Sequence, residues 1–163
     1  MGKKTFHILL VEDNPADVEL TRNAFKEASS CLRLDVAEDG DSALALLRGD
    51  GDDGKAEPPD LVLLDLNLPG TDGMEVLRAM RSDDQLKRIP VVVLTSSASP
   101  QDVERCYDLF ASAYVVKPMI FDRFVEIVKQ IESFWFDVAT LATDVRLGKS
   151  EATAYRFLGP SLN

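Results

Sequence analysis

The stretch Leu61–Gly70, with the sequence LVLLDLNLPG, decides the fold class of this chain. It places a short apolar run directly before Asp65 and a turn sequence after it. A run of Leu and Val without polar alternation is typical of a strand buried on both faces of a parallel sheet. Similar runs predict four further strands, at Phe6–Val11, Leu32–Val36, Val91–Leu94 and Ala113–Val116.

The segments between these runs have the spacing of amphipathic helices. Asn14-Pro15 and Ser99-Pro100 each place a capping residue before a proline at the first helical position. Residues 121–135 carry apolar side chains on one helical face. Because strands and helices alternate along the chain, the sequence predicts a doubly wound α/β fold, in which a parallel sheet has helices on both faces.

The composition argues against nucleic acid and membranes as partners. The 163 residues include 18 Lys and Arg against 28 Asp and Glu, a formal net charge of −10. Contacts to phosphate groups need Lys and Arg, so this balance disfavours them. We find no signal peptide and no apolar run of the roughly 20 residues that span a membrane, and we expect a cytoplasmic protein. Cys31 and Cys106 lack metal-binding spacing and are expected to be thiols.

Polar residues directly follow four of the predicted strands, namely Glu12-Asp13, Asp65, Thr95 and Lys117. In such sheets the ligand site lies outside the carboxyl ends of the strands, so these side chains should meet at one edge. Three carboxylates in one place repel one another unless a cation joins them, and hard oxygen ligands suit Mg²⁺. A carboxylate beside a metal and a lysine is a suitable nucleophile for a phosphoryl group.

Four segments together resemble the receiver domain of two-component response regulators. They are HILLVEDN at 7–14, LVLLDLNLPG at 61–70, VLTS at 93–96 and YVVKP at 114–118. Their order, spacing and strand context agree with that family over about residues 5–135. The resemblance implies a flavodoxin-like (CheY-like) five-stranded sheet with strand order 2-1-3-4-5. Residues 136–163 would form a C-terminal extension, helical to about residue 146 and then a tail.

The resemblance also implies a phospho-acceptor and a metal site. Asp65 would accept the phosphoryl group from a phosphohistidine of a sensor histidine kinase. Asp13 and Asp65 would bind Mg²⁺ directly. The backbone carbonyl of Asn67 would supply a third ligand, and Glu12 would act through water. The chain would then be a switch rather than an enzyme, with at most self-phosphorylation and autodephosphorylation activity.

Further residues would carry the switch. Lys117 would pair with the phospho-acceptor and then with the phosphoryl oxygens. Thr95 would donate its hydroxyl to the phosphoryl group, and the small Ser96 would leave room for its approach. Pro118 would follow a cis peptide bond that aims the lysine into the site. Tyr114 would change its orientation with Thr95.

The loop at 49–59 and the Phe134-Trp135 ending are similar to the single-domain regulators paired with bacterial phytochromes. This likeness implies a phytochrome-type sensor kinase and a homodimer through the face of the fourth helix, fifth strand and fifth helix. Residues 136–146 would extend the fifth helix and contribute to the dimer. One position departs from the family, which often has Gly seven residues before the lysine. Here that residue is Phe110, which would alter the helix end or supply an interface.

Three other interpretations fit parts of the pattern. A flavodoxin has the same topology but needs free backbone amides for phosphate after the first strand, where this chain has Glu12-Asp13. A Mg²⁺-dependent aspartyl phosphatase of the haloacid dehalogenase type needs a second acid two residues after its nucleophile, where this chain has Asn67. A phosphorylation-independent interaction module would be expected to lack part of the acid and lysine set. His7, near the start of the first strand, should lie far from the site.

Overall fold

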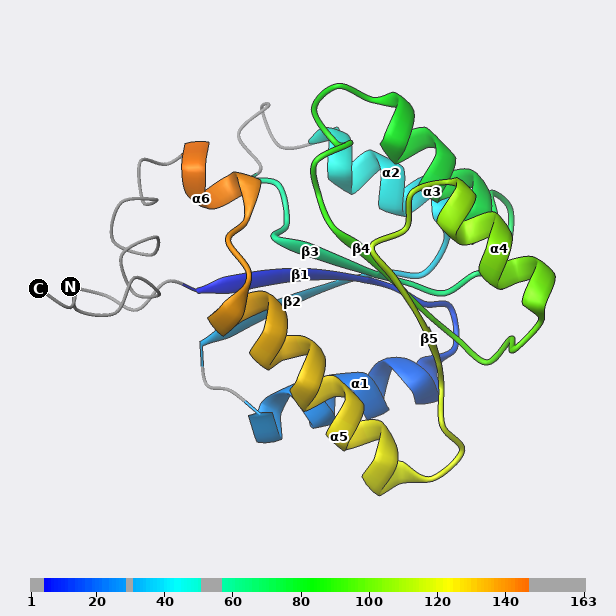
Figure 1. The fold of residues 1–163 in the computed structure, drawn as a ribbon, viewed down its shortest axis with the longest axis vertical. Helices are drawn as coiled ribbons and strands as arrows, with labels where there is room; N and C mark the ends of the chain where they lie inside the picture. Colours follow the sequence, from blue (N-terminus) through cyan, green and yellow to red (C-terminus); the bar gives the residue numbers. More distant parts are fainter. Residues whose placement is uncertain (1–4, 29–30, 51–56, 147–163) are drawn as a thin grey trace, which may run out of the picture.

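The chain folds as a five-stranded parallel sheet with helices on both faces (Figure 1). The computed structural model describes residues 5–28, 31–50 and 57–146. The strand order is β2-β1-β3-β4-β5 and every pairing is parallel, which confirms the predicted fold class. The strands are β1 (Phe6–Val11), β2 (Leu32–Ala37), β3 (Leu61–Leu64), β4 (Val91–Thr95) and β5 (Ala113–Val116).

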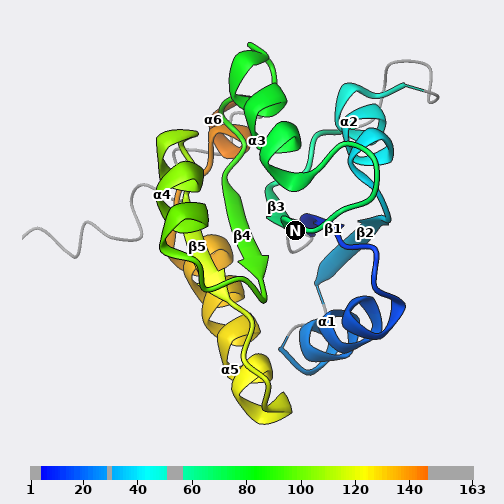
Figure 2. The ribbon, with the colours of Figure 1, turned by 90° about the vertical axis from the view of Figure 1, so that its right-hand side faces the viewer.

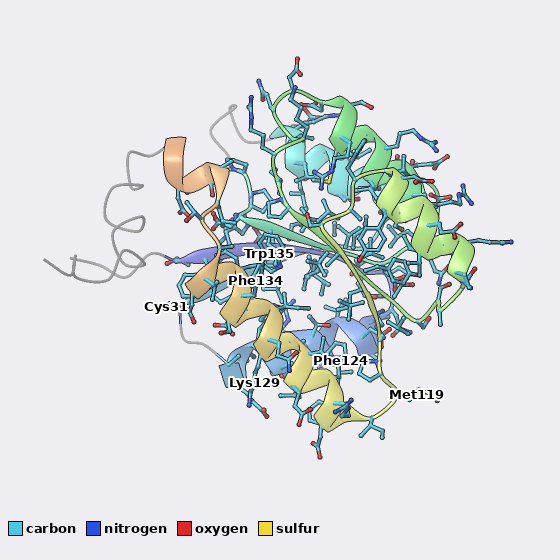
Figure 3. All side chains as sticks on the ribbon, viewed as in Figure 1. Cys31, Met119, Phe124, Lys129, Phe134 and Trp135 are labelled. Atoms are coloured by element: carbon cyan, nitrogen blue, oxygen red, sulfur yellow. The ribbon has the colours of Figure 1, made fainter. Side chains whose placement is uncertain are left out.

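Helices α1 and α5 pack together on one face of the sheet, and α2, α3 and α4 cover the other (Figure 2). Phe124 of α5 is buried against the sheet, whereas Met119, in the loop before that helix, projects into solvent (Figure 3). Within the described ranges, no helix is long and apolar enough to cross a membrane. The helices are α1 (Pro15–Ala28), α2 (Gly40–Arg48), α3 (Gly73–Ser82), α4 (Pro100–Asp108) and α5 (Phe121–Glu132).

Each face of the sheet has its own hydrophobic core, and β3 contributes to both. Leu61 and Leu63 point into the core shared with α1 and α5, whereas Val62 and Leu64 point into the core shared with α2, α3 and α4. All four side chains are fully buried. A strand between two cores has no solvent-facing side, which explains why this run is apolar at every position. Neither cysteine forms a disulfide.

Local capping fixes the start of α1 but not of α4. Asn14 Oδ1 accepts hydrogen bonds from the backbone N–H groups of Ala16 at 2.9 Å and Asp17 at 3.2 Å, as the capping signal predicted. Ser99 precedes α4, but its hydroxyl makes no capping bond. The predicted helix start at Ser99-Pro100 is therefore confirmed, with Ser99 at the N-cap position, but it rests on Pro100, whose fixed φ suits the first turn, and not on a side-chain capping bond.

The C-terminal segment turns back onto the sheet instead of extending α5. A π-helical stretch, η1 (Ser133–Val138), follows α5, and Ala139 is then extended before α6 (Ala142–Arg146) begins (Figure 1). The prediction that residues 136–146 continue the fifth helix is therefore wrong. The predicted tail from residue 147, and residues 51–56 of the loop at 49–59, lie outside the described residues.

Burial of apolar side chains explains this turn. The ring of Phe136 contacts that of Phe6, with centroids 5.1 Å apart, and Leu141 is buried in the core shared with α1 and α5. Thr143 Oγ1 donates a 2.7 Å hydrogen bond to Asp60 Oδ1, just before β3. A straight continuation of α5 would leave these apolar groups in water, so folding back is favoured.

Phe110 ends α4 in a conformation that favours glycine. Its φ angle is 61°, and among the described residues it is the one non-glycine with positive φ. Its N–H donates to Tyr107 O at 2.9 Å, and its side chain is 76% exposed. A left-handed residue just after a helix is the usual glycine-type ending. The departure from the family pattern therefore changes the side chain but not the way the helix ends.

We expect Phe110→Gly to raise the free energy of unfolding by about 1 kcal/mol, because glycine adopts positive φ without a clash at Cβ. Little packing is lost, since the ring is mostly exposed. Urea unfolding measures the change. The control, Phe110→Ala, keeps the β-carbon and should gain nothing; a glycine variant less stable than the natural chain would contradict this account.

Candidate functional site

The carboxyl ends of β1, β3, β4 and β5 bring one acid, a second acid, a hydroxyl and a lysine together. Lys117 Nζ donates to Asp65 Oδ2 at 2.8 Å, and Thr95 Oγ1 donates to Asp65 Oδ1 at 3.2 Å. Glu12 accepts a further hydrogen bond from Lys117. Each residue ends or follows a strand of the parallel sheet, so the topology alone carries them to one edge.

Lys117 lies at the centre of three carboxylates. Besides Glu12 and Asp65, its ammonium group contacts Asp17 Oδ2 at 3.1 Å. The side chains of Lys117, Glu12 and Asp65 are only 12%, 3% and 8% exposed, whereas that of Asp17 is 38% exposed. One positive charge therefore faces three acids in a mostly buried place, which leaves the cluster with an excess of acid groups.

The environment shifts the pKa values of the two buried acids in opposite directions. Burial and a hydrogen bond with Asp65 raise the pKa of Glu12 to about 7. Burial acts in the same direction on Asp65, but hydrogen bonds from Glu12 and Lys117 outweigh it and lower the pKa of Asp65. Burial would lower the pKa of Lys117, but its bonds to Asp65 and Glu12 raise it. Asp65 is therefore the ionised carboxylate, the form that acts as a nucleophile.

The loop after β3 holds Asp65 in place. The backbone N–H of Asn67 donates to Asp65 Oδ1 at 3.0 Å, and Gly73 N–H donates to Leu66 O at 3.1 Å. A β-carbon on Gly73 would lie 2.3 Å from the Asp65 carbonyl oxygen, so only glycine lets α3 start this close to the loop. The Asn67 N–H group and the close start of α3 at Gly73 thus hold Asp65 in its orientation.

The remaining predicted residues lie around this centre. Asp13 and Ser96 are exposed. Tyr114 is half-buried, and its hydroxyl donates to Ser97 O at 2.8 Å, two residues beyond Thr95. The described residues contain no cis peptide bond, so the predicted cis bond before Pro118 is wrong. The trans form is the lower-energy isomer, and the lysine reaches the acids from it.

The predicted metal ligands do not form a closed set of side chains. Within the described residues, no group of three or more His, Cys, Asp and Glu side chains is arranged to hold a metal ion. The centre of the acid cluster contains the Lys117 ammonium group, and Asp13 is exposed. The oxygen donors and their excess negative charge nevertheless have the chemistry that a hard divalent cation prefers.

Sequence reasoning did not assign Asp17 to the site. The residue lies in the first turn of α1, 100 positions from Lys117 in sequence, and no strand end marks it. Its signal was its position in the first turn of the helix that directly follows the β1 end carrying Glu12.

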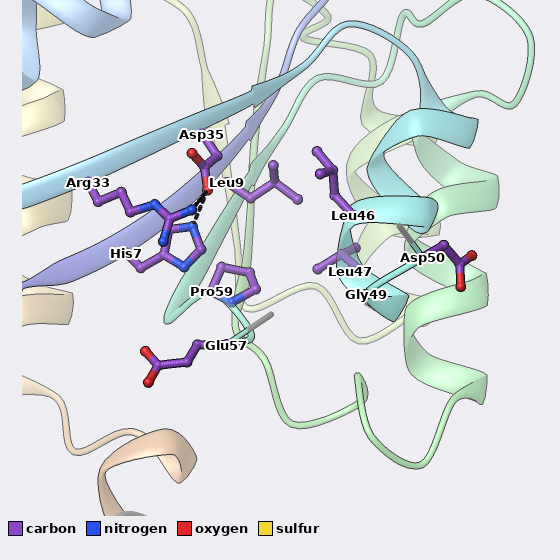
Figure 4. Close-up of a pocket in the computed structure, with 10 residues that line it drawn as sticks. All are labelled: His7, Leu9, Arg33, Asp35, Leu46, Leu47, Gly49, Asp50, Glu57 and Pro59. Carbon is purple, nitrogen blue, oxygen red and sulfur yellow. Dashed lines mark hydrogen bonds and ion pairs between the residues drawn. The ribbon is translucent and has the colours of Figure 1, made fainter. Parts of the chain in front are cut away.

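His7 lies outside the site, as expected. Its ring Nε2 is 2.7 Å from Asp35 Oδ2, and Arg33 pairs with the same oxygen at 3.0 Å (Figure 4). These residues line a pocket of about 290 Å³ between the sheet and the end of α2. His7 follows the first residue of β1, at the opposite end of that strand from Glu12, and has a structural contact there.

The family model for the response regulator receiver domain matches residues 8–129. The chain belongs to the response regulator receiver family. Receiver domains act in two-component signalling, generally as switches. The match spans most of β1, all of β2 to β5, and the three acids that contact Lys117.

Relatives and solved structures support this assignment. The response regulator Rcp1 of Synechocystis sp. is 42% identical over 134 residues, which cover 82% of this chain and 91% of Rcp1. A crystal structure of the phosphorylated cyanobacterial phytochrome response regulator RcpA is 44% identical, with a TM-score of 0.80 over 84% of this receiver chain and 98% of RcpA. The Mn²⁺-bound form of Rcp1 is 41% identical, with a TM-score of 0.77 over 83% and 98% of the two chains.

We expect Lys117→Ala to lower the free energy of unfolding by about 3 kcal/mol near pH 7 in metal-free buffer, because two buried carboxylates lose their counter-charge. Without the ammonium group the folded-state pKa of Asp65 is no longer lowered, and that of Glu12, already raised, rises further. Protonation of these acids then favours the folded state, so the loss shrinks toward about pH 5. Urea unfolding at both pH values measures this.

The matched control is Lys129→Ala, which removes an exposed lysine of α5. It should change the free energy of unfolding by less than about 0.5 kcal/mol at either pH. Equal effects of the two substitutions would show that the Lys117 contacts do not stabilise the folded chain.

Proposed function

We propose that this receiver chain is a phospho-acceptor switch that takes a phosphoryl group onto Asp65 from a phosphohistidine of a sensor histidine kinase. The observation that carries the proposal is the Asp65 carboxylate itself, which is ionised and buried and receives hydrogen bonds on both oxygens. A fixed, ionised carboxylate beside a lysine is preorganised to attack phosphorus.

The transfer follows from these contacts. A carboxylate oxygen of Asp65 forms a bond to phosphorus while the P–N bond to the kinase histidine breaks. The bonding electron pair stays on the imidazole nitrogen, which takes up a proton. Lys117 and Thr95 already donate to the two Asp65 oxygens and can shift to the phosphoryl oxygens, where they stabilise the added charge.

A divalent cation, which we propose to be Mg²⁺, completes the site. Asp13 and Asp65 would hold it directly, with the carbonyl of Asn67, and Glu12 would act through water. The excess of acid over base at the cluster supports this, as does the Mn²⁺-bound form of the relative Rcp1. Such a cation supplies charge neutralisation for the phosphoryl oxygens.

The signal leaves the site through a neighbouring surface. Thr95 turns toward the phosphoryl group, and Tyr114, whose hydroxyl contacts Ser97, follows into the space released. The exposed face of α4, β5 and α5, which carries Tyr107 and Val116, then changes its affinity for partners. We propose that this face forms a homodimer, and that Ser96, exposed beside Thr95, leaves the approach to Asp65 open.

The sensor kinase is proposed to be of the phytochrome type. RcpA is a phytochrome response regulator, and its similarity extends over 84% of this chain. The proposed output is a change in the protein–protein contacts of the face formed by α4, β5 and α5.

We expect Asp65→Asn to abolish labelling by acetyl phosphate with Mg²⁺ and to abolish the spectral change caused by beryllofluoride, because an amide is not a nucleophile. Intact-mass spectrometry measures the first and intrinsic fluorescence the second. The control, Asp122→Asn, changes an exposed acid at the start of α5 and should label normally. Labelling of the Asp65 variant would overturn the proposal.

A further inference from the structure

A cationic hollow lies at the end of the sheet opposite to Asp65. It has a volume of about 400 Å³ and is lined chiefly by Arg81, Lys87, Arg88, Ile89 and Phe110. We call it the Arg81–Phe110 hollow. Its lining contains three cationic side chains and no acid, although the whole chain has a net charge of −10. The hollow lies beside the residues that enter β4, whereas the phospho-acceptor follows the exit from β3.

Arg81 brings a positive charge into this hollow and forms no ion pair with a carboxylate of the described residues. Its Nε donates to Phe110 O at 2.9 Å, and its Nη1 donates to the carbonyls of Lys87 at 3.0 Å and Ile89 at 2.8 Å. Guanidinium has five N–H donors, and among the described residues these bonds engage Nε and Nη1 but not Nη2. Two donors on a fixed cation therefore remain for an anionic oxygen.

Phe110 supplies an aromatic anchor at the rim of the same hollow. Its backbone N–H is held by Tyr107 O and its carbonyl by Arg81, so the ring is presented on a rigid turn. Its positive φ and 76% exposure are both unfavourable for a phenylalanine. A residue kept in such a conformation and in water is a reason to look for a function at that position.

Arginine beside an exposed aromatic is the composition of an interface hot spot. Aromatic residues and arginine are enriched where protein partners bind, whereas lysine is depleted there. Arg88, which also lines the hollow, is exposed and adds a second guanidinium, and Lys87 is already paired with Asp84 at 2.7 Å. The positive charge of the hollow favours an acidic partner. The exposed ring of Phe110 favours an apolar side chain next to the acid.

We propose that the Arg81–Phe110 hollow binds a partner protein through an acidic segment, with a carboxylate on Arg81 and Arg88 and an apolar side chain against Phe110. The hollow lies at the other end of the strands from Asp65, and its three cations are present whether or not Asp65 carries a phosphoryl group. Nucleic acid is a poor occupant, because a phosphate chain is bound by an extended row of Lys and Arg, whereas this hollow is compact and offers three cations.

The test is a titration of the ¹⁵N-labelled full chain with the peptide acetyl-Asp-Glu-Leu-Phe-Asp-Glu-amide, followed by amide chemical shifts. Shifts should gather at residues 81, 87–89 and 110–112. Phe110→Gly and Arg88→Glu should each weaken binding about tenfold. Because we expect Phe110→Gly to stabilise the fold, loss of binding in that variant does not reflect unfolding.

Matched controls separate this surface from general charge and apolar effects. Arg78→Glu makes the same charge change on the exposed side of α3, outside the hollow, and Phe134→Ala removes an exposed ring beyond α5. Both should bind the peptide normally, and the peptide with lysine in place of each acid should not bind. Three results would overturn the proposal: no shifts with millimolar peptide, shifts elsewhere, or equal binding of the lysine peptide. A self-association that Arg88→Glu abolishes, without peptide binding, would overturn it in favour of a second copy.

Discussion

The contact of one ammonium group with three carboxylates organises this molecule. Lys117 after β5 reaches Glu12 after β1, Asp17 in α1 and Asp65 after β3, so four separate segments meet at one atom. In a mostly buried place such charges are stable only as a set, because each acid left unpaired would be costly. The same set makes Asp65 an oriented, ionised nucleophile and keeps negative charge at the edge for a cation. Fold and proposed chemistry therefore depend on the same ion pairs.

The sequence predicted most of the fold and the main site residues because both follow from one rule. Apolar runs such as Leu61–Leu64 mark strands buried on both faces, and the polar residue after each run lies at the carboxyl edge. The rule does not identify Asp17, because this acid lies in a helix and not at the end of a strand. Its partner, Lys117, is 100 residues away in the sequence. The rule does not predict the turn at Ala139 either, because the spacing of Val138 to Val145 fits a continuing helix. The path of the chain here depends on the packing of Phe136 against Phe6, a tertiary contact that the periodicity of the sequence does not encode.

The two ends of the sheet are proposed to serve different ligands. At the carboxyl ends, excess acid attracts a cation and a phosphoryl group, and Thr95 and Tyr114 connect that edge to α4 and β5. At the other end, Arg81 clamps three carbonyls and fixes the strained turn of Phe110. A regulator with both surfaces can bind one partner in response to phosphorylation at Asp65. It can bind another through the permanent positive charge of the Arg81–Phe110 hollow.

Chemical trapping tests the central claim most directly. The chain is incubated with acetyl phosphate and Mg²⁺, reduced with borohydride, which converts an aspartyl phosphate to homoserine, and digested for tandem mass spectrometry. The account predicts homoserine at position 65 and an unmodified Asp at positions 13 and 17. Homoserine at another position, or an unmodified Asp65 after complete reaction, would contradict it.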